Sequence, residues 1–247
     1  MRNGADWWPA LAIAGGVALA CAPLFVALPP AAFVAVWLVA FVLRSLAPVH
    51  QHCHAHYAVF RRPIANAAYD LVLALAAGNV TAVWELQHVA GHHRGYLTPE
   101  RDPAACERFG RSRIVFTLLG DALSVTDSLR IARRDGRSPA RLWRQQLGYL
   151  AVLALLVAVQ PVLALACFVA PALLLRWLVF WVSYGQHHDV PLGDVYSGSV
   201  THFGATNRFY LNVGHHTAHH EKPTLHWTRL PARTALILER IPASCLR

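Results

Sequence analysis

The chain has 247 residues, enough for one domain with a sizeable core and too few to require a second. Hydrophobic residues make up 55% of it and charged residues 14%, and the mean hydropathy is +0.36, a balance that favours a protein solvated largely by lipid. The net charge of +9 comes from arginines that flank apolar runs, which argues against a nucleic-acid-binding domain and favours contact with anionic lipid head groups.

The first predicted element is a helical hairpin. An apolar run from about Trp8 to Leu28 has roughly the twenty residues needed to cross a bilayer, and Pro29–Pro30 ends it. A second run from Ala31 to about Ala47 returns across the membrane and leads directly into a histidine cluster. The segment Ala18–Cys21 loosely resembles a signal-peptide cleavage or lipoprotein site, but the apolar run continues past it and a second span follows, so we expect a retained span.

The next apolar runs, Ile64 to Val83 and Ile114 to Val125, are shorter or more interrupted, and arginine-rich sequence follows them. They predict interfacial or partly buried helices. The long apolar stretch from Leu147 to Ser183 is broken at Gln160–Pro161 and predicts a second hairpin of two spans. We therefore expect an all-α membrane protein, a single domain over residues 1–247, with four transmembrane helices in two hairpins, interfacial helices and a histidine-rich cytoplasmic cap.

The orientation follows from the arginines, because positively charged residues favour the cytoplasmic side of a membrane. The hairpin tips carry no lysine or arginine, so we expect the middle segment and both termini to be cytoplasmic. The arginines between the hairpins are Arg61, Arg62, Arg94, Arg101, Arg108, Arg111, Arg113, Arg130, Arg133, Arg134, Arg137, Arg141 and Arg144.

Fifteen histidines stand out in the composition, and most fall in four short clusters. The first cluster spans residues 50–56 and alternates histidine with other residues. On a helix, residues four apart share a face, so either His50 with His54 or His52 with His56 can point at one metal ion. We expect His50 and His54 to be the ligands.

The second cluster has the pattern H-x-x-x-H-H. His88 and His92 share a helical face, while His93 lies more than a quarter turn further round and suits a second metal ion. Two polar or aromatic residues beside this cluster, Glu85 and Trp84, are candidates to orient or wall the site.

The third cluster places His216, His219 and His220 at i, i+3 and i+4, on one helical face. A further pair, His187–His188, follows the last predicted span and can supply one more ligand, which we assign to His187. The doubled histidines leave the register open by one residue, so that His188 or His215 can replace an assigned neighbour.

The assigned imidazoles exceed what one first-row metal ion accepts but suffice for two, so a dinuclear site is expected. No catalytic residue beyond the ligands is predicted. Polar residues that can accept the other ring N–H, if they do not simply cap helices or face solvent, are Asp70, Glu85, Gln87, Gln186, Asp189, Asn207, Asn212 and Glu221. The nine expected ligands are His50, His54, His88, His92, His93, His187, His216, His219 and His220.

These three boxes at the ends of two membrane hairpins resemble those of the membrane fatty acid desaturase and hydroxylase superfamily. The resemblance covers nearly the whole chain, and Asn212–Pro223 followed by His226-Trp227 looks especially like bacterial desaturases. It implies a bacterial inner-membrane enzyme with two non-haem iron ions bound by the nine histidines. It further implies dioxygen as co-substrate, a lipid or fatty acyl substrate, and electrons from a separate ferredoxin-, rubredoxin- or cytochrome-type protein.

Three functions remain in view. The leading hypothesis is an acyl-lipid desaturase, and the close rival is a hydroxylase or other oxygenase of an alkyl, sterol-like or carotenoid-like substrate, because the boxes do not determine how a C–H bond is placed against the oxidant. The third is a non-catalytic membrane metal-binding protein. The apolar spans disfavour it, since a metal carrier is expected to place polar ligands along its membrane path.

Overall fold

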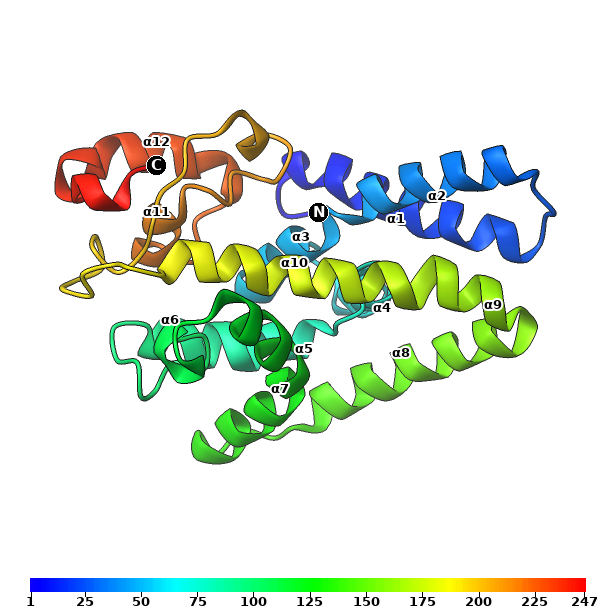
Figure 1. Cartoon of the computed structure of the whole chain (residues 1–247), viewed down its shortest axis with the longest axis horizontal. Helices are drawn as coiled ribbons and strands as arrows, with labels where there is room; N and C mark the ends of the chain where they lie inside the picture. Colours follow the sequence, from blue (N-terminus) through cyan, green and yellow to red (C-terminus); the bar gives the residue numbers. More distant parts are fainter. The chain divides into compact units, whose positions relative to one another are not determined.

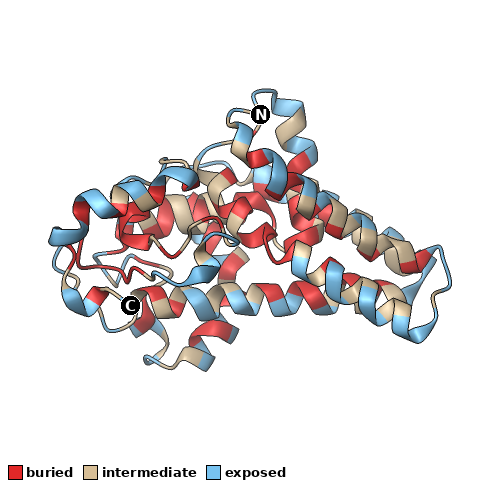
Figure 2. Cartoon of the chain, turned by 90° about the horizontal axis from the view of Figure 1, so that it is seen from above, coloured by how far each residue is buried: buried red, intermediate tan, exposed pale blue.

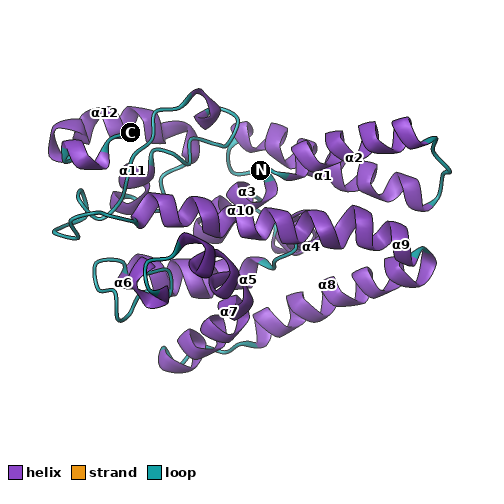
Figure 3. Cartoon of the chain, in the orientation of Figure 1, coloured by secondary structure: helices purple, strands orange, loops and turns teal.

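The computed structural model describes residues 1–247, and all its regular elements are helices (Figure 1; Figure 3). The only ladder-type pairing is an isolated bridge between Thr201 and Leu246. Four helices are long and apolar enough to cross a membrane, namely Gly4–Leu24, Pro30–His56, Ala140–Val159 and Pro161–His187. The expected all-α class with four candidate spans is therefore confirmed.

The chain divides into two compact units, each assembled from segments that are distant in the sequence. The first unit comprises Met1–His54, Ala58–Ala82 and Pro139–Arg176, and the second comprises Ala55–Tyr57, Val83–Ser138 and Trp177–Arg247. The first unit contains most of the apolar helices. The second contains most of the histidines in the boxes, and the single-domain expectation stays a prediction.

The first hairpin consists of α1, Trp7–Cys21, and α2, Pro30–Arg44, which lie side by side (Figure 1). Proline suits the first turn of α2, where its missing N–H has no helical partner to lose. The second span extends further than expected. Instead of ending near Ala47 it continues through α3, Ala47–His56, as one run of 27 residues, so the first histidine cluster is the end of the span itself.

The second hairpin begins with α8, Ala140–Val159, which ends where Gln160 leaves helical geometry before a proline. The return arm is α9, Pro161–Ala164, followed by the π-helix η5, Leu165–Val169, and by α10, Ala170–His187. In the most apolar stretch of α8, only 11% of the residues are buried inside the protein. Figure 2 shows such exposed and half-buried residues along the spanning helices, as expected for surfaces that lipid covers.

Between the hairpins the chain forms α4, Pro63–Ala77, which ends at Gly78 in the left-handed region with φ of 72°. A side chain at Gly78 would place its Cβ 2.4 Å from that of Ala172, so glycine is required there. The next helical stretch, Thr81–Gly95, is bent by 91° from α4, as in a broken span or a re-entrant loop. It is composed of α5, Thr81–Val83, the π-helix η3, Trp84–His92, and α6, His93–Gly95.

The helix α7, Arg113–Arg134, is much longer than the apolar run that predicted it, and Ser112 caps its start. The C-terminal part contains α11, His216–Glu221, and α12, Leu230–Ile237. The remaining elements are short 3₁₀ turns: η1, Gly4–Asp6; η2, Ala22–Leu24; η4, Cys106–Phe109; η6, Ala205–Asn207; η7, Trp227–Arg229; η8, Leu238–Arg240; and η9, Ala243–Cys245.

A buried arginine ties the first unit together. Arg44, at the end of α2, is 1% exposed, and its guanidinium donates to the carbonyl oxygens of Leu75 and Ala76, both at 3.1 Å, and to that of Cys167. Two of these acceptors belong to the last turn of α4, where helix carbonyls have no partner within the helix. Arg44 therefore supplies donors to backbone groups that water cannot reach.

Arg44→Met is expected to lower the free energy of unfolding by about 3 kcal/mol, because it leaves three buried carbonyl groups without their donor. Denaturant unfolding of the purified protein in detergent measures this difference. The matched control, Arg62→Met at an exposed arginine, is expected to stay within about 0.5 kcal/mol of the wild type. Equal effects of the two substitutions would refute this role of Arg44.

Candidate metal centre

The second unit brings eight imidazoles together in two groups. We call His56, His88, His93 and His219 the first histidine group, and His92, His187, His216 and His220 the second histidine group. Within each group, one nitrogen from every ring lies within 4.8 Å of the corresponding nitrogens of the others. Each group combines residues from segments far apart in the sequence, so tertiary folding creates both.

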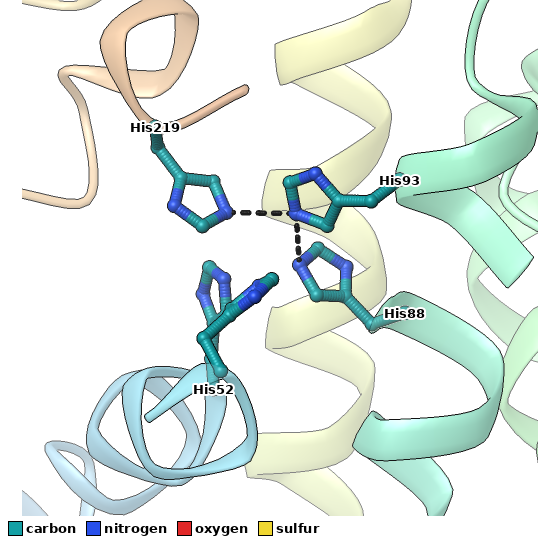
Figure 4. A group of neighbouring side chains, drawn as sticks. His52, His88, His93 and His219 are labelled. Carbon is teal, nitrogen blue, oxygen red and sulfur yellow. Dashed lines mark hydrogen bonds between the residues drawn. The ribbon is translucent and has the colours of Figure 1, made fainter. Parts of the chain in front are cut away.

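In the first histidine group, His93 is central. Its Nε2 atom lies 3.0 Å from Nε2 of His88 and 2.9 Å from Nε2 of His219 (Figure 4). The His56 ring stands edge-on to His93, with ring centroids 4.6 Å apart. Figure 4 also labels His52, which lies one turn before His56 on α3.

The second histidine group is a chain of contacts between Nε2 atoms. His216 lies 2.9 Å from His187 and 3.2 Å from His220, and His220 lies 3.3 Å from His92. These distances join Nε2 atoms throughout. All four side chains are buried or half-buried, so the nitrogens face one another instead of water.

The π-helix η3 explains how the second box divides between the groups. The sequence predicted that His88 and His92 share a face, but His88 belongs with His93, and His92 belongs to the other group. The N–H of His93 donates to the carbonyl of His88, five residues earlier, instead of four as in an α-helix. The wider turn brings positions five apart onto nearly the same face, which an α-helical period does not allow.

The third box also divides. His219 joins the first histidine group, whereas His216 and His220 join the second, although all three had been expected on one face. They lie on α11, a helix of six residues, and adjacent positions on a helix point about 100° apart. The neighbouring residues His219 and His220 therefore direct their rings to different groups, so α11 contributes to both.

The second ring nitrogens of His92 and His187 each contact an acceptor. Nδ1 of His92 lies 2.9 Å from both carboxylate oxygens of Asp102, and Nδ1 of His187 lies 3.2 Å from the carbonyl oxygen of Gly198. When Nδ1–H donates to these acceptors, Nε2 keeps its lone pair for the centre of the group. A Cβ at Gly198 would lie 2.5 Å from the ring of Tyr96, so this acceptor also depends on glycine.

The ionisation of the buried groups matches this arrangement. Burial, followed by the charge of neighbouring imidazoles, holds the pKa of His220 well below its usual value, so the ring is neutral at pH 7. Burial raises the pKa of the Asp102 carboxyl, but the contacts with His92 and the hydrogen bond from the amide of Ala104 together outweigh it and lower that pKa overall. The result is an anionic carboxylate beside the second histidine group and a neutral ring at His220, the state in which imidazole binds metals.

The donor set fits metal ions. Nε2 of His93 lies in contact with two other ring nitrogens, and a single proton can satisfy only one such contact. Two nitrogens bound side by side to one ion, with bonds of about 2.1 Å, stand roughly 3 Å apart. The observed separations of 2.9 to 3.3 Å have this size, and imidazole suits iron, copper, nickel and zinc.

The expected ligands His50 and His54 lie elsewhere. Both are in the first unit, where His50 contacts the hydroxyl of Tyr69 at 2.6 Å and Asp6 at 3.3 Å. His54 accepts from the amide of Val59 and lies 3.3 Å from Asp70. The structure does not bring these two rings into either histidine group, and of the two alternatives in the first cluster it places His56 there instead. The other seven expected ligands all lie in the groups.

Two further histidines and most of the polar residues considered as supports have partners outside the groups. His188 pairs with Asp189, and His215 contacts Thr234. The side-chain amides of Gln186 and Asn212 donate to the carbonyl oxygens of Val213 and Trp227. The side chain of Asn207 donates to the carbonyl of His202 and accepts from the amide of Gly214, and Glu221 forms an ion pair with Arg233. Glu85 and Gln87 lie on η3. Trp84 stands edge-on to His88 with centroids 5.4 Å apart, and Trp227 contacts His226.

Two residues beside the second histidine group were not identified from the sequence. Asp102 is 5% exposed, and its only local signal is a carboxylate in the polar loop that follows the second box. The Tyr96 ring stacks on His220 with centroids 4.1 Å apart, and its hydroxyl donates to the carbonyl of Val195. A loop has no period from which such contacts can be derived.

Asp102→Ala is expected to weaken metal binding by the second histidine group about 10- to 100-fold, the usual cost of losing the carboxylate that orients a ligand imidazole. Asp102→Asn keeps an oxygen acceptor without the charge and should fall between that variant and the wild type. Competition with a chromogenic chelator measures the affinity of the purified protein. Glu100→Ala, at an exposed carboxylate of the same loop, is the control, and an equal loss there would contradict the assignment.

The comparisons with known proteins agree with this geometry. A family model described as fatty acid desaturase matches residues 27–247, which is well over half of the chain and contains every histidine of both groups. No curated protein matches the chain.

Proposed function

Because this chain belongs to the fatty acid desaturase family and is therefore of an oxidoreductase type, we propose that it inserts a carbon–carbon double bond into a fatty acyl chain at the expense of dioxygen. The observation that carries the proposal is the pair of histidine groups in the second unit. A purely structural role does not require eight imidazoles with nitrogen facing nitrogen, since buried polar groups without partners are costly.

The proposed cofactor is two iron ions, one in each group. His56, His88, His93 and His219 hold the first, with His52 as a fifth ligand because it precedes His56 by one helical turn. His92, His187, His216 and His220 hold the second. When bound, the ions supply the redox chemistry that reduces dioxygen and removes hydrogen from an unactivated C–H bond.

The protein's own residues orient the ligands and exclude water. Asp102 and the carbonyl of Gly198 hold the rings of His92 and His187 with Nε2 directed inward. Tyr96 covers one face of His220. The neutral state of His220 keeps its nitrogen available without a competing proton. These contacts preorganise the site before any substrate arrives.

The substrate is proposed to be the alkyl chain of a membrane lipid or fatty acyl group. Four apolar helices and the family together indicate an integral membrane protein, and such a protein draws an apolar substrate from the bilayer that surrounds it. We further propose that the protein lies in a bacterial inner membrane, with both termini and the metal centre in the cytoplasm, and that a separate redox protein supplies electrons.

Product analysis tests the proposal. Membranes that contain the protein are incubated with lipid extract, with and without oxygen, and the products are compared by mass spectrometry. Desaturation removes two hydrogens from the chain, whereas the rival hydroxylase reaction adds one oxygen atom. Loss of two hydrogens only in the presence of oxygen supports a desaturase. Stoichiometric zinc without any oxygen-dependent product, in protein expressed with sufficient iron, would instead identify a non-catalytic metal-binding protein.

A further inference from the structure

A polar cavity of about 220 Å³ in the second unit touches the second histidine group. Its buried and half-buried lining residues include Tyr96, Asp102 and His187. These residues connect it to three ligands, because Asp102 accepts from His92, His187 is itself in the group, and Tyr96 stacks on His220. The cavity therefore borders the second histidine group.

The cavity also has a charged and accessible part of its lining. Glu107, Arg111 and Asp189 line it, with side chains that are 41%, 64% and 63% exposed. Arg111 and Glu107, four residues apart in the sequence, form an ion pair at 3.2 Å. Both Arg111 and Asp189 have a positive φ, of 59° and 55°, so the backbone on both sides of this opening holds an uncommon conformation.

The chemistry proposed above requires polar and apolar reagents to reach one place. Desaturation combines an alkyl chain, dioxygen, two electrons and two protons, and it yields the alkene and two water molecules. The alkyl chain and dioxygen are apolar and dissolve in the bilayer, whereas protons and water do not. A separate polar passage between the metal centre and water is therefore needed, and the hydroxylase alternative has the same need for protons.

We propose that this cavity is the passage through which protons enter and product water leaves. It has room for several water molecules, and its wall offers the polar partners that ordered water requires. The passage serves the second histidine group directly, through His187. This inference rests on the proposed function, since it assigns the cavity a part in that reaction.

The test is to obstruct the cavity and measure how fast a small polar probe reaches the centre. Ala105 and Val190 line it from different segments of the chain. In Ala105→Phe, the rate at which azide binds to the oxidised, iron-loaded protein is expected to fall about tenfold, with iron content unchanged, because access becomes limiting. Stopped-flow absorbance follows azide binding without substrate or electron donor. Turnover should fall in parallel and show a larger solvent deuterium isotope effect.

A second variant avoids any folding defect. Val190→Cys is purified, folded and loaded with iron, then labelled at the new thiol with a bulky methanethiosulfonate, and azide binding is compared before and after labelling. The wild type labelled in the same way controls for its five cysteines, and Ala122→Phe on the exposed surface of α7 controls for the added ring.

The outcomes separate the two hypotheses. If azide binding slows in the obstructed variants but not in the controls, the passage is supported, whatever the product of the enzyme. Wild-type rates after both obstructions would overturn it, even if the chain proves to be a desaturase. Failure of the proposed function appears independently, as a wild-type protein that holds iron but forms no oxygen-dependent product.

Discussion

His219→Ala is expected to leave the purified chain with about half of its metal and to lower turnover by at least about 10³-fold, since the two ions act as one unit. His219 contributes its ring to the first histidine group, where Nε2 lies 2.9 Å from that of His93. Alanine removes that nitrogen, so α11 no longer contributes a ring to the first histidine group. The second histidine group keeps all four of its members.

The next residue provides the matched experiment. His220→Ala is expected to remove the other half of the metal, because His220 contacts both His92 and His216 in the second histidine group. Metal analysis of the folded, membrane-extracted protein measures both variants, and spectroscopy of the remaining ion should distinguish them. His226→Ala, at a histidine outside both groups, is expected to keep its full metal content.

The pair is informative because the residues are adjacent. A general disturbance of α11 would affect both variants alike and give the same spectrum. Full metal content and normal turnover in either variant would contradict the assignment of that residue to its group.

The second large effect concerns the first cluster. His56→Ala is expected to lose the metal of the first histidine group together with activity, whereas His54→Ala is expected to retain both metals in the protein that folds. The two residues lie on one helix and differ in surroundings, because His54 contacts Asp70 and the amide of Val59. The loss of these contacts should reduce the free energy of unfolding by about 1–3 kcal/mol.

Metal stoichiometry and thermal unfolding, measured on the same samples, separate these effects. His56→Ala should change the stoichiometry, and His54→Ala should change mainly the unfolding of the first unit. The opposite pattern, with metal lost in His54→Ala and kept in His56→Ala, would restore the ligands expected from the sequence.

The spans could be predicted because twenty apolar residues between prolines and arginines have few alternatives in a folded protein. Their bounds were less accurate: the second span continues through the histidines to His56, and α8 begins at Ala140 instead of near Leu147. Amphipathic helix ends are not apolar, so hydropathy alone does not include them.

The histidine boxes could also be recognised, because histidines three and four residues apart, repeated in several clusters, indicate metal ligands on helices. Their division into groups could not be predicted, because it depends on which histidines of α3 take part and on the π-helical turn in η3. Neither is encoded in an α-helical period. Asp102 and Tyr96 were missed for a related reason, since loops bring distant residues together without a repeating pattern.

The π-helical turn also constrains how this chain can vary. Because His93 lies five positions after its partner His88, and not four, the spacing along the chain matters as much as the identity of the ligands. Inserting one residue between them would keep every imidazole but turn His93 about a further 100° around the helix axis, away from His88. Homologues and engineered variants should therefore tolerate many substitutions in this stretch but no insertion.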